Sequence, residues 1–182
     1  QLVSGTSIGL LRISGLLMKE VPECFGFFSG EEAVSTEQLR MSLDAMLNDD
    51  AVKTILLEID SPGGQVAGTQ ELGDAIVLAS EEKPVVAAIR DLCASGAYWL
   101  ASQATEVTAN HTAFIGSIGV YMVVDDMSRM FEAAGIKTHV ISSGGVKGAG
   151  VEGAPVSDEA IAVWREEVTQ LKDIFVQVIA NG

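Results

Sequence analysis

Hydrophobic residues in this chain form short continuous runs, separated by stretches in which they recur every three or four positions. The continuous runs lie at residues 8–13, 52–59, 84–89, around Val107, and within 114–120 and 138–141. Short runs rich in Val, Ile and Leu are typical of strands in a parallel sheet. We therefore predict strands at these places, with a tight turn as the alternative within 114–120. The strand at 52–59 is expected to be buried on both faces.

The periodic stretches predict amphipathic helices. They lie at residues 36–48, 66–80, from 95 onward, at 125–134, and from 158 to the end. Ser35 or Thr36 is expected to cap the first helix and Ser157 the last, because short hydroxyl side chains accept from free N–H groups there. The last helix carries a coiled-coil-like stripe that packs either on its own domain or on a neighbouring subunit. The stripe consists of Ile161, Trp164, Val168, Leu171, Phe175 and Val178.

Strands and helices alternate along the whole chain, which indicates an α/β fold. Right-handed βαβ crossovers and a mostly parallel sheet flanked by helices follow from that order. Residues 15–36 show no clear period and are expected to form a loop. The aromatic side chains in this loop either fill the edge of the core or form a substrate-groove wall or subunit contact. They belong to Phe25, Phe27 and Phe28.

Length, charge and cysteine content narrow the class of protein. The 182 residues suit one domain over residues 1–182, and a net charge of −14 argues against binding to nucleic acid or an anionic membrane. Cys24 and Cys93 are far apart and form no CxxC motif, which favours a reducing compartment slightly. Neither a signal peptide nor an apolar run of transmembrane length is visible. Both ends look cut, so we expect an anchor or further segment outside this sequence.

Two residues far apart in the chain are candidates for the chemistry. Ser95 stands among small residues at the start of an apolar helix, where the helix dipole and the N–H of Gly96 favour a developing anion. Lys147 stands in a glycine-rich loop. A lysine amine becomes a useful base when burial disfavours its charged form, because its ordinary pKa is about 10.4. Taken singly, the serine is as well explained as a helix cap and the lysine as a solvated surface group.

Glycine and serine motifs supply further candidates. Gly63 and Gly64 follow a strand and Pro62, and glycines let backbone N–H groups approach a ligand as in an oxyanion hole. Ser117, within GSIG, is a hydroxyl that would orient the lysine amine; each of these motifs is otherwise a turn. The remaining nucleophilic side chains, in His111, His139 and Cys93, stand in no activating context, so structural roles are expected for them.

The order of these motifs is more specific than any one of them. SPGG, ASGAYW, GSIG and SGxxK each follow a strand-like segment, and this order resembles the SppA (signal peptide peptidase, protease IV) family of serine peptidases. The resemblance covers nearly the whole chain. Ser95 lies 52 positions before Lys147 and 22 before Ser117, which fits single-domain members of that family. Residues 98–102 and 125–129 are more similar to the phage-encoded branch, which includes head-maturation proteases.

The resemblance implies a ClpP/crotonase fold with repeated ββα/βαβ units, and a role for each motif. Ser95 would be the nucleophile and Lys147 the general base. Gly63 or Gly64, together with Gly96, would supply oxyanion N–H groups. The family pattern departs here at Ala97, where many members have a second glycine, and at Gly148, where Asp often follows the lysine. These departures bear on substrate preference more than on the Ser/Lys dyad.

The family also implies an activity and partners. A serine endopeptidase would act through an acyl-enzyme, without metal or cofactor, and Ser117 would hold the lysine amine. Expected substrates are polypeptides: signal-peptide remnants, phage scaffold and capsid proteins, or misfolded chains in general. Members form rings or domes, and the lysine can come from a neighbouring subunit. The cytoplasm of a bacterial or phage-infected cell is the expected location.

Two alternatives stay open at this point. A crotonase-like acyl-CoA enzyme would use the same fold and a glycine oxyanion hole to stabilise an enolate. Against this alternative, the sequence shows no basic residues placed for a CoA phosphate and no glutamate pair in register with Ser95. The other alternative is a non-catalytic assembly module, in which the apolar loop and the last helix build a ring.

Overall fold

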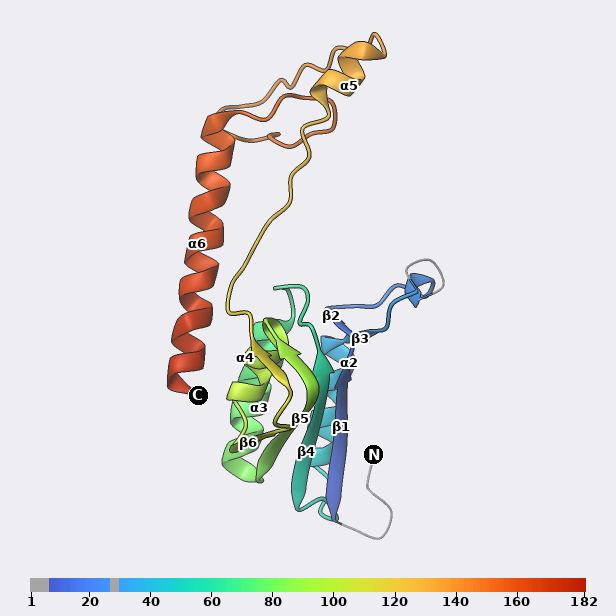
Figure 1. Ribbon diagram of the computed structural model, residues 1–182, viewed down its shortest axis with the longest axis vertical. Helices are drawn as coiled ribbons and strands as arrows, with labels where there is room; N and C mark the ends of the chain where they lie inside the picture. The colour runs from blue at the N-terminus through green and yellow to red at the C-terminus, as the bar shows by residue number, and fades with distance from the viewer. Residues whose placement is uncertain (1–6, 27–29) are drawn as a thin grey trace. The chain divides into compact units, whose positions relative to one another are not determined.

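The computed structural model describes residues 7–26 and 30–182 (Figure 1). The chain divides into two compact units. Unit 1 comprises Gln1–Ile118 and Phe175–Gly182, and unit 2 comprises Gly119–Ile174. The assignment of residues 1–182 to one peptidase domain stays a prediction.

A five-stranded parallel sheet forms the centre of unit 1. Its order is β1-β4-β5-β6, and β7 pairs with the later part of β5. The strands are β1 (Ile8–Ser14), β4 (Thr54–Ser61), β5 (Val85–Ala94), β6 (Glu106–Ala109) and β7 (Phe114–Gly116). All pairs within this sheet are parallel, so the mostly parallel sheet is confirmed, as are the strands predicted at 8–13, 52–59, 84–89, around Val107 and within 114–120.

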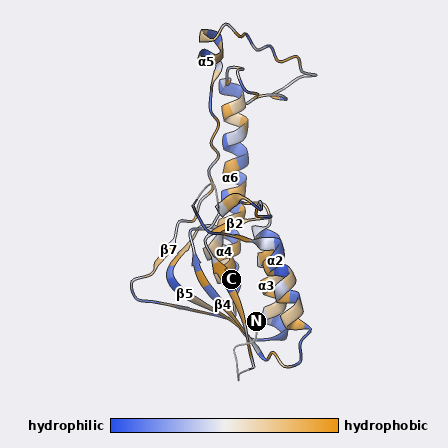
Figure 2. Cartoon of the chain, turned by 90° about the vertical axis from the view of Figure 1, so that its right-hand side faces the viewer, coloured by the Kyte–Doolittle hydropathy of each residue, from blue (hydrophilic) through white to orange (hydrophobic). Residues whose placement is uncertain are grey.

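Three helices cover one face of this sheet: α2 (Thr36–Leu47), α3 (Thr69–Glu82) and α4 (Gly96–Ser102). Figure 2 shows α2 and α3 on the same side of β4 and β5. The succession β4-α3-β5 is a βαβ unit with parallel strands, so the predicted α/β class is confirmed. The ClpP/crotonase form of that class stays a prediction. The predicted cap of α2 is also confirmed, because Ser35 Oγ accepts from the N–H of Gln38 at 3.2 Å.

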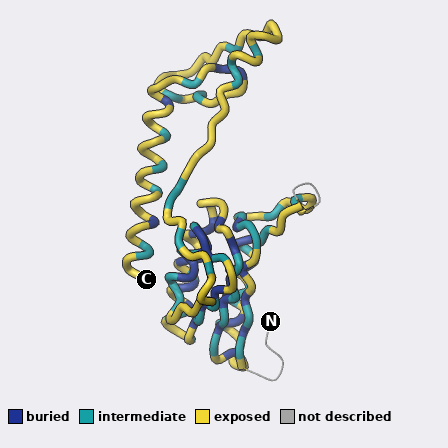
Figure 3. Tube along the Cα trace, in the orientation of Figure 1, coloured by how far each residue is buried: buried dark blue, intermediate teal, exposed yellow. Residues whose placement is uncertain are grey.

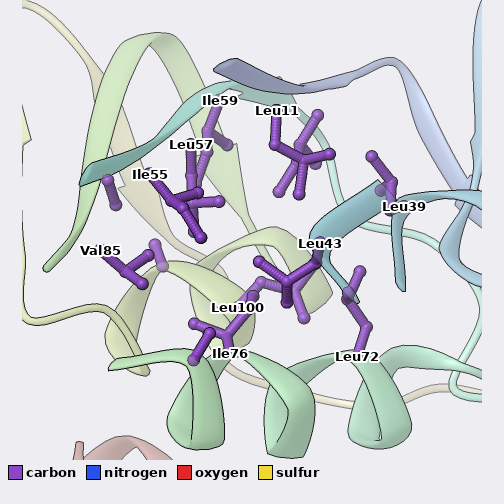
Figure 4. Packing of buried hydrophobic residues seen from close by; sticks show 14 of the residues in the cluster. Leu11, Leu39, Leu43, Ile55, Leu57, Ile59, Leu72, Ile76, Val85 and Leu100 are labelled. Atoms are coloured by element: carbon purple, nitrogen blue, oxygen red, sulfur yellow. The ribbon is translucent and has the colours of Figure 1, made fainter. Parts of the chain in front are cut away.

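The hydrophobic core lies between the sheet and these helices (Figure 4). Ile55, Leu57 and Ile59 of β4 are fully buried and face Leu43 of α2 and Ile76 of α3. Such alternation of buried and partly buried positions is the period-2 signature of a strand with one covered face.

The expectation that residues 52–59 are buried on both faces is wrong. On the uncovered face of the sheet the side chain of Glu58 accepts from Arg12 Nε at 3.2 Å and from Arg90 Nη1 at 3.0 Å. The three side chains form a partly solvated ion-pair row across β1, β4 and β5. Because α2, α3 and α4 all pack on the opposite face, none of these three helices buries this row.

The loop expected at residues 15–36 contains two short strands. β2 (Leu16–Met18) and β3 (Ala33–Ser35) pair in parallel, and Leu17 is fully buried. Phe27 and Phe28 lie outside the described residues. Phe25 is half-buried and does not belong to the core cluster, so it does not plug the core edge as one alternative expected.

Unit 2 contains α5 (Ser128–Ala133) and most of α6 (Asp158–Asn181), whose residues from Phe175 onward belong to unit 1. Ser157 caps α6 as predicted, since its Oγ accepts from the N–H of Ala160 at 3.2 Å. Residues 138–141 form no strand, so that prediction is wrong. A strand requires a hydrogen-bonded neighbour, and the described part of unit 2 contains no other strand to provide one.

Burial differs sharply between the units. All residues of the core cluster within the described chain belong to unit 1. Unit 2 is exposed along most of its length, as Figure 3 shows for its loops and the first part of α6. No helix in residues 7–26 and 30–182 has the length and apolar character needed to cross a bilayer.

Candidate active site

Ser95 lies in the sharp turn that connects β5 to α4. Its backbone has φ 52° and ψ −127°, a conformation that side-chain-bearing residues rarely adopt. Ser95 and Ser117 (φ 56°) are the non-glycine residues with positive φ in the described part of the chain. Such strain persists only where the surrounding structure enforces it, and it collects at functional sites. Both residues had been singled out from the sequence for chemical reasons.

The Ser95 hydroxyl is not used as a helix cap. Its side chain makes no capping hydrogen bond to α4, and the residue is half-buried, so the oxygen is within reach of a ligand. The backbone carbonyl of Ser95 accepts from the N–H groups of Tyr98 (2.9 Å) and Trp99 (3.1 Å) instead. The serine is therefore held by its backbone, and its side chain stays available.

Strand β7 brings Ser117 to this turn. The N–H of Ser95 donates to the carbonyl of Gly116 at 2.8 Å, and Ala94 pairs with Gly116 in the β5–β7 ladder. Ser117 follows directly and is exposed. The structure thus brings together two serines that lie 22 positions apart in sequence.

The SPGG turn packs against the same point. A side chain at Gly63 (φ 90°) would place Cβ 2.7 Å from the Ala94 carbonyl oxygen, 2.7 Å from Ser95 Cβ and 2.8 Å from the Gly96 nitrogen. Only glycine permits this approach, because any larger residue would collide with backbone atoms. Gly63 therefore forms the contact between the two turns.

The two glycines of this turn differ in how their backbone groups are used. Gly63 is buried, its N–H donates to Ser61 Oγ at 3.1 Å, and its carbonyl accepts from the N–H of Leu17 at 2.8 Å. Gly64 is exposed, and within the described residues its N–H donates no hydrogen bond. Gly96 is the first residue of α4, so its N–H has no acceptor within the helix.

Lys147 is an exposed residue in a turn of unit 2. The structure gathers Ser95, Gly63, Gly64, Gly96 and Ser117 in unit 1, and the approach of Lys147 to Ser95 stays a prediction.

Cys93 fits the structural role that the sequence predicts for it. Cys93 is fully buried two residues before Ser95, and burial raises the pKa of its thiol to about 12. A thiol that stays protonated at neutral pH is a poor nucleophile. His111 and His139 are exposed, and residues 7–26 and 30–182 hold no cluster of three or more His, Cys, Asp or Glu side chains suited to a metal.

Sequence reasoning missed two residues that shape this site. Ser61 was treated only as part of a turn motif, although a hydroxyl at the buried end of a strand is a signal for a hydrogen-bonded partner. Leu17 forms an isolated parallel bridge to Gly64 from a segment that was expected to be a loop. Nothing in the local sequence around Leu17 indicates that bridge.

Known proteins resemble this chain over most of its length. The capsid assembly protease C of Escherichia phage lambda is 31% identical over 95% of this chain and 39% of its own length. The chloroplastic serine protease SPPA of Arabidopsis thaliana is 28% identical over 79% of this chain and 21% of its own length. The chain spans less than half the length of these relatives.

Among solved structures, a membrane-bound stomatin-specific protease mutant in complex with a substrate peptide gives a TM-score of 0.49 at 14% identity. The match covers 68% of this chain and 50% of that one. The sequence profile of peptidase family S49 matches residues 78–182, more than half of the chain. This match and the SPPA and phage protease relatives confirm the resemblance to the SppA family. The chain belongs to peptidase family S49.

Proposed function

We propose that the protein is a serine endopeptidase with Ser95 as nucleophile and Lys147 as general base. The observation that carries the proposal is the turn at Ser95, whose backbone is strained, whose hydroxyl serves no capping role and whose neighbours are two glycine turns. A strained strand-to-helix turn that presents a hydroxyl is a geometry suited to a nucleophile. Membership of family S49 supports the same reading.

The reaction follows from these roles. The neutral amine of Lys147 accepts the Ser95 hydroxyl proton as the oxygen attacks a peptide carbonyl. The resulting ammonium then protonates the leaving amine, and an acyl-enzyme remains on Ser95. Water activated by the same amine attacks the ester and releases the second product. Ser117, beside the Ser95 turn, accepts from or donates to the amine and orients it.

Gly64 and Gly96 are the donors that we assign to the oxyanion. An oxyanion hole needs N–H groups that are not already paired. Among the described residues, Gly64 and Gly96 meet that condition, whereas the N–H of Gly63 already donates to Ser61. Of the two glycines that the sequence left open, Gly64 is therefore the donor and Gly63 the packing contact.

The substrate is a polypeptide, and the enzyme works as a homo-oligomeric ring in the bacterial or phage-infected cytoplasm. The phage lambda relative is named a capsid assembly protease and an Enterococcus faecium relative bears the name signal peptide peptidase SppA, so the proposal covers both scaffold or capsid proteins and signal-peptide remnants. In such a ring Lys147 completes the active site of a neighbouring subunit. Lys147 belongs to unit 2 and Ser95 to unit 1.

Mass spectrometry of the intact protein after treatment with a serine-directed phosphonate tests the proposal. We expect a single adduct at Ser95 in the wild type, none in Ser95→Ala and strongly slowed labelling in Lys147→Ala. Both variants should fold, as judged by circular dichroism, and should not hydrolyse peptides. Full activity of Lys147→Ala, or an adduct at another serine, would contradict the dyad.

A further inference from the structure

We propose that Ser61 is a positioning residue that sets the geometry of the oxyanion donors. The inference rests on the proposed function, because it concerns the same site, and it assigns a role to a hydroxyl that does not touch the substrate. Ser61 is the last residue of β4 and is fully buried. Its oxygen joins two backbone groups from different parts of the chain.

The hydrogen bonds of Ser61 have fixed directions. Its Oγ lies 2.6 Å from the carbonyl oxygen of Gly15 and 3.1 Å from the nitrogen of Gly63. A carbonyl oxygen only accepts and a backbone N–H only donates, so the Ser61 hydroxyl donates to Gly15 and accepts from Gly63. The single hydroxyl proton of Ser61 thereby pairs the carbonyl of Gly15, and one lone pair of its oxygen pairs the N–H of Gly63.

This pair of bonds ties the SPGG turn to the end of the first strand. Gly15 follows β1 directly, has φ 77°, and its N–H donates to the Asp60 carbonyl at 3.1 Å. The ends of β1 and β4 are thus linked both by a backbone bond and through Ser61. The turn that carries Gly63 is anchored to the rigid sheet rather than to a loop.

Gly63 connects Ser61 to the two oxyanion donors, the N–H groups of Gly64 and Gly96. Its N–H is held by Ser61, its carbonyl by Leu17, and its α-carbon lies against Ser95 and Gly96. The bridge to Leu17 uses the carbonyl of Gly63 and the N–H of Gln65. The N–H of Gly64 lies between these two groups and points away from Leu17. Its direction is fixed because Gly63 is held by all of these contacts. Ser61 therefore fixes the Gly64 N–H relative to the Gly96 N–H.

Removing the hydroxyl leaves the buried N–H of Gly63 without an acceptor. A buried unpaired donor is unfavourable enough to make the turn rotate toward another acceptor or water. Such a rotation moves the Gly64 N–H away from the position of the oxyanion. A misplacement of about 1 Å at a catalytic group lowers rate about 100-fold, so kcat should fall between about 10- and 100-fold while KM changes little.

The experiment compares steady-state kinetics of wild type with Ser61→Ala, Ser61→Cys and Ser61→Thr on a peptide substrate. Ser61→Cys preserves the volume but offers only a weak hydrogen bond, so it should lose kcat as Ser61→Ala does. Ser61→Thr keeps the hydroxyl and should recover most of the activity. Ser14→Ala is the matched control, because Ser14 also ends a strand but its Oγ bonds to the exposed side chain of Glu32 at 3.4 Å.

Two further measurements separate this inference from the proposed function. Phosphonate labelling of wild type at Ser95 establishes the nucleophile independently of Ser61. Hydrogen exchange at the Gly63 amide should be faster in Ser61→Ala and Ser61→Cys than in wild type and Ser61→Thr, whether or not the enzyme turns over. An unchanged exchange rate in both, or a kcat within about twofold of wild type for folded Ser61→Cys, would overturn the inference.

Discussion

The strain at Ser95 makes a stability prediction that is independent of activity. Glycine adopts φ 52° and ψ −127° without penalty, whereas alanine pays about 1–3 kcal/mol there. Glycine also loses about 0.4–1 kcal/mol more backbone entropy on folding. We therefore expect Ser95→Gly to be more stable than Ser95→Ala by about 1 kcal/mol in urea denaturation, although both variants are inactive. A less stable glycine variant would show that the turn is not strained.

Gly63 is predicted to tolerate no side chain. Gly63→Ala brings Cβ within 2.7–2.8 Å of the Ser95 turn and adds the cost of positive φ. We expect a loss of about 3 kcal/mol in stability and a kcat reduced at least about 100-fold. Gly135→Ala is the control, since its φ of 78° is similar but nothing lies within 4 Å of the new Cβ. That variant should lose only about 1 kcal/mol; equal effects of the two substitutions would contradict the packing argument.

Cys93 should make the free energy of unfolding fall at alkaline pH. Burial raises its pKa from about 9 to about 12, so above pH 9 the unfolded chain releases a proton that the folded chain retains. Stabilisation is complete below pH 9 and is lost as the pH rises toward 12, by up to about 1.4 kcal/mol per pH unit.

Chemical denaturation from pH 8 to 10.5 measures this slope, and Cys93→Ala should remove it. In the native protein the exposed Cys24 should react with a thiol reagent and Cys93 should not. An identical slope in the variant would mean that other groups cause the pH dependence.

At the scale of elements, the contact between α4 and the end of α6 is the clearest test of packing. The rings of Trp99 and Phe175 lie with centroids 5.1 Å apart, and Phe175 is 2% exposed. Phe175→Ala should cost about 3–5 kcal/mol and shift the fluorescence of Trp99 to the red as water enters. Val176→Ala, at a position 47% exposed, should change stability by less than about 0.5 kcal/mol. If the two variants were equally stable, α6 would not be docked through Phe175.

The sequence was sufficient for elements whose signal is local. The apolar runs of β1, β4 and β5 and the caps at Ser35 and Ser157 were all predictable, since each depends on neighbouring residues. Prediction from the sequence failed where an element's structure depends on a neighbouring strand or helix. The strand at 138–141 lacks a neighbour in unit 2, and burial of β4 on one face depends on all three helices packing on the same side.

The same limit applies to the site. Motif order was enough to select Ser95, Gly63 and Ser117, which the structure gathers at one turn. The role inferred for Ser61 depends on Gly15, 46 positions away, and no spacing rule connects them. The choice between Gly63 and Gly64 likewise required knowing which N–H was already paired.

At the scale of the whole molecule, unit 2 is notable for its exposed apolar residues. Tyr121 is 87% exposed, Val123 73% and Ile141 97%. A cavity of about 510 Å³ in the same unit is lined by Val120, Met122 and Trp164, among others. Exposed apolar surface on this scale is typical of protein interfaces. The proposed homo-oligomer would cover it, and Lys147 lies in the same unit.

Subunit mixing tests whether this unit completes the site of a neighbour. The Ser95→Ala and Lys147→Ala variants are each expected to be inactive. In a ring where each active site combines Ser95 of one subunit with Lys147 of its neighbour, an assembly of both variants contains some complete sites. At equal amounts, half of the chains supply Ser95 and half of their neighbours supply Lys147, so about a quarter of wild-type activity should return. The recovered activity per chain should fall on dilution, because the intact sites exist only between subunits. Wild-type activity that is independent of concentration, together with no recovery in co-expressed mixtures, would mean that Lys147 acts on Ser95 of its own chain.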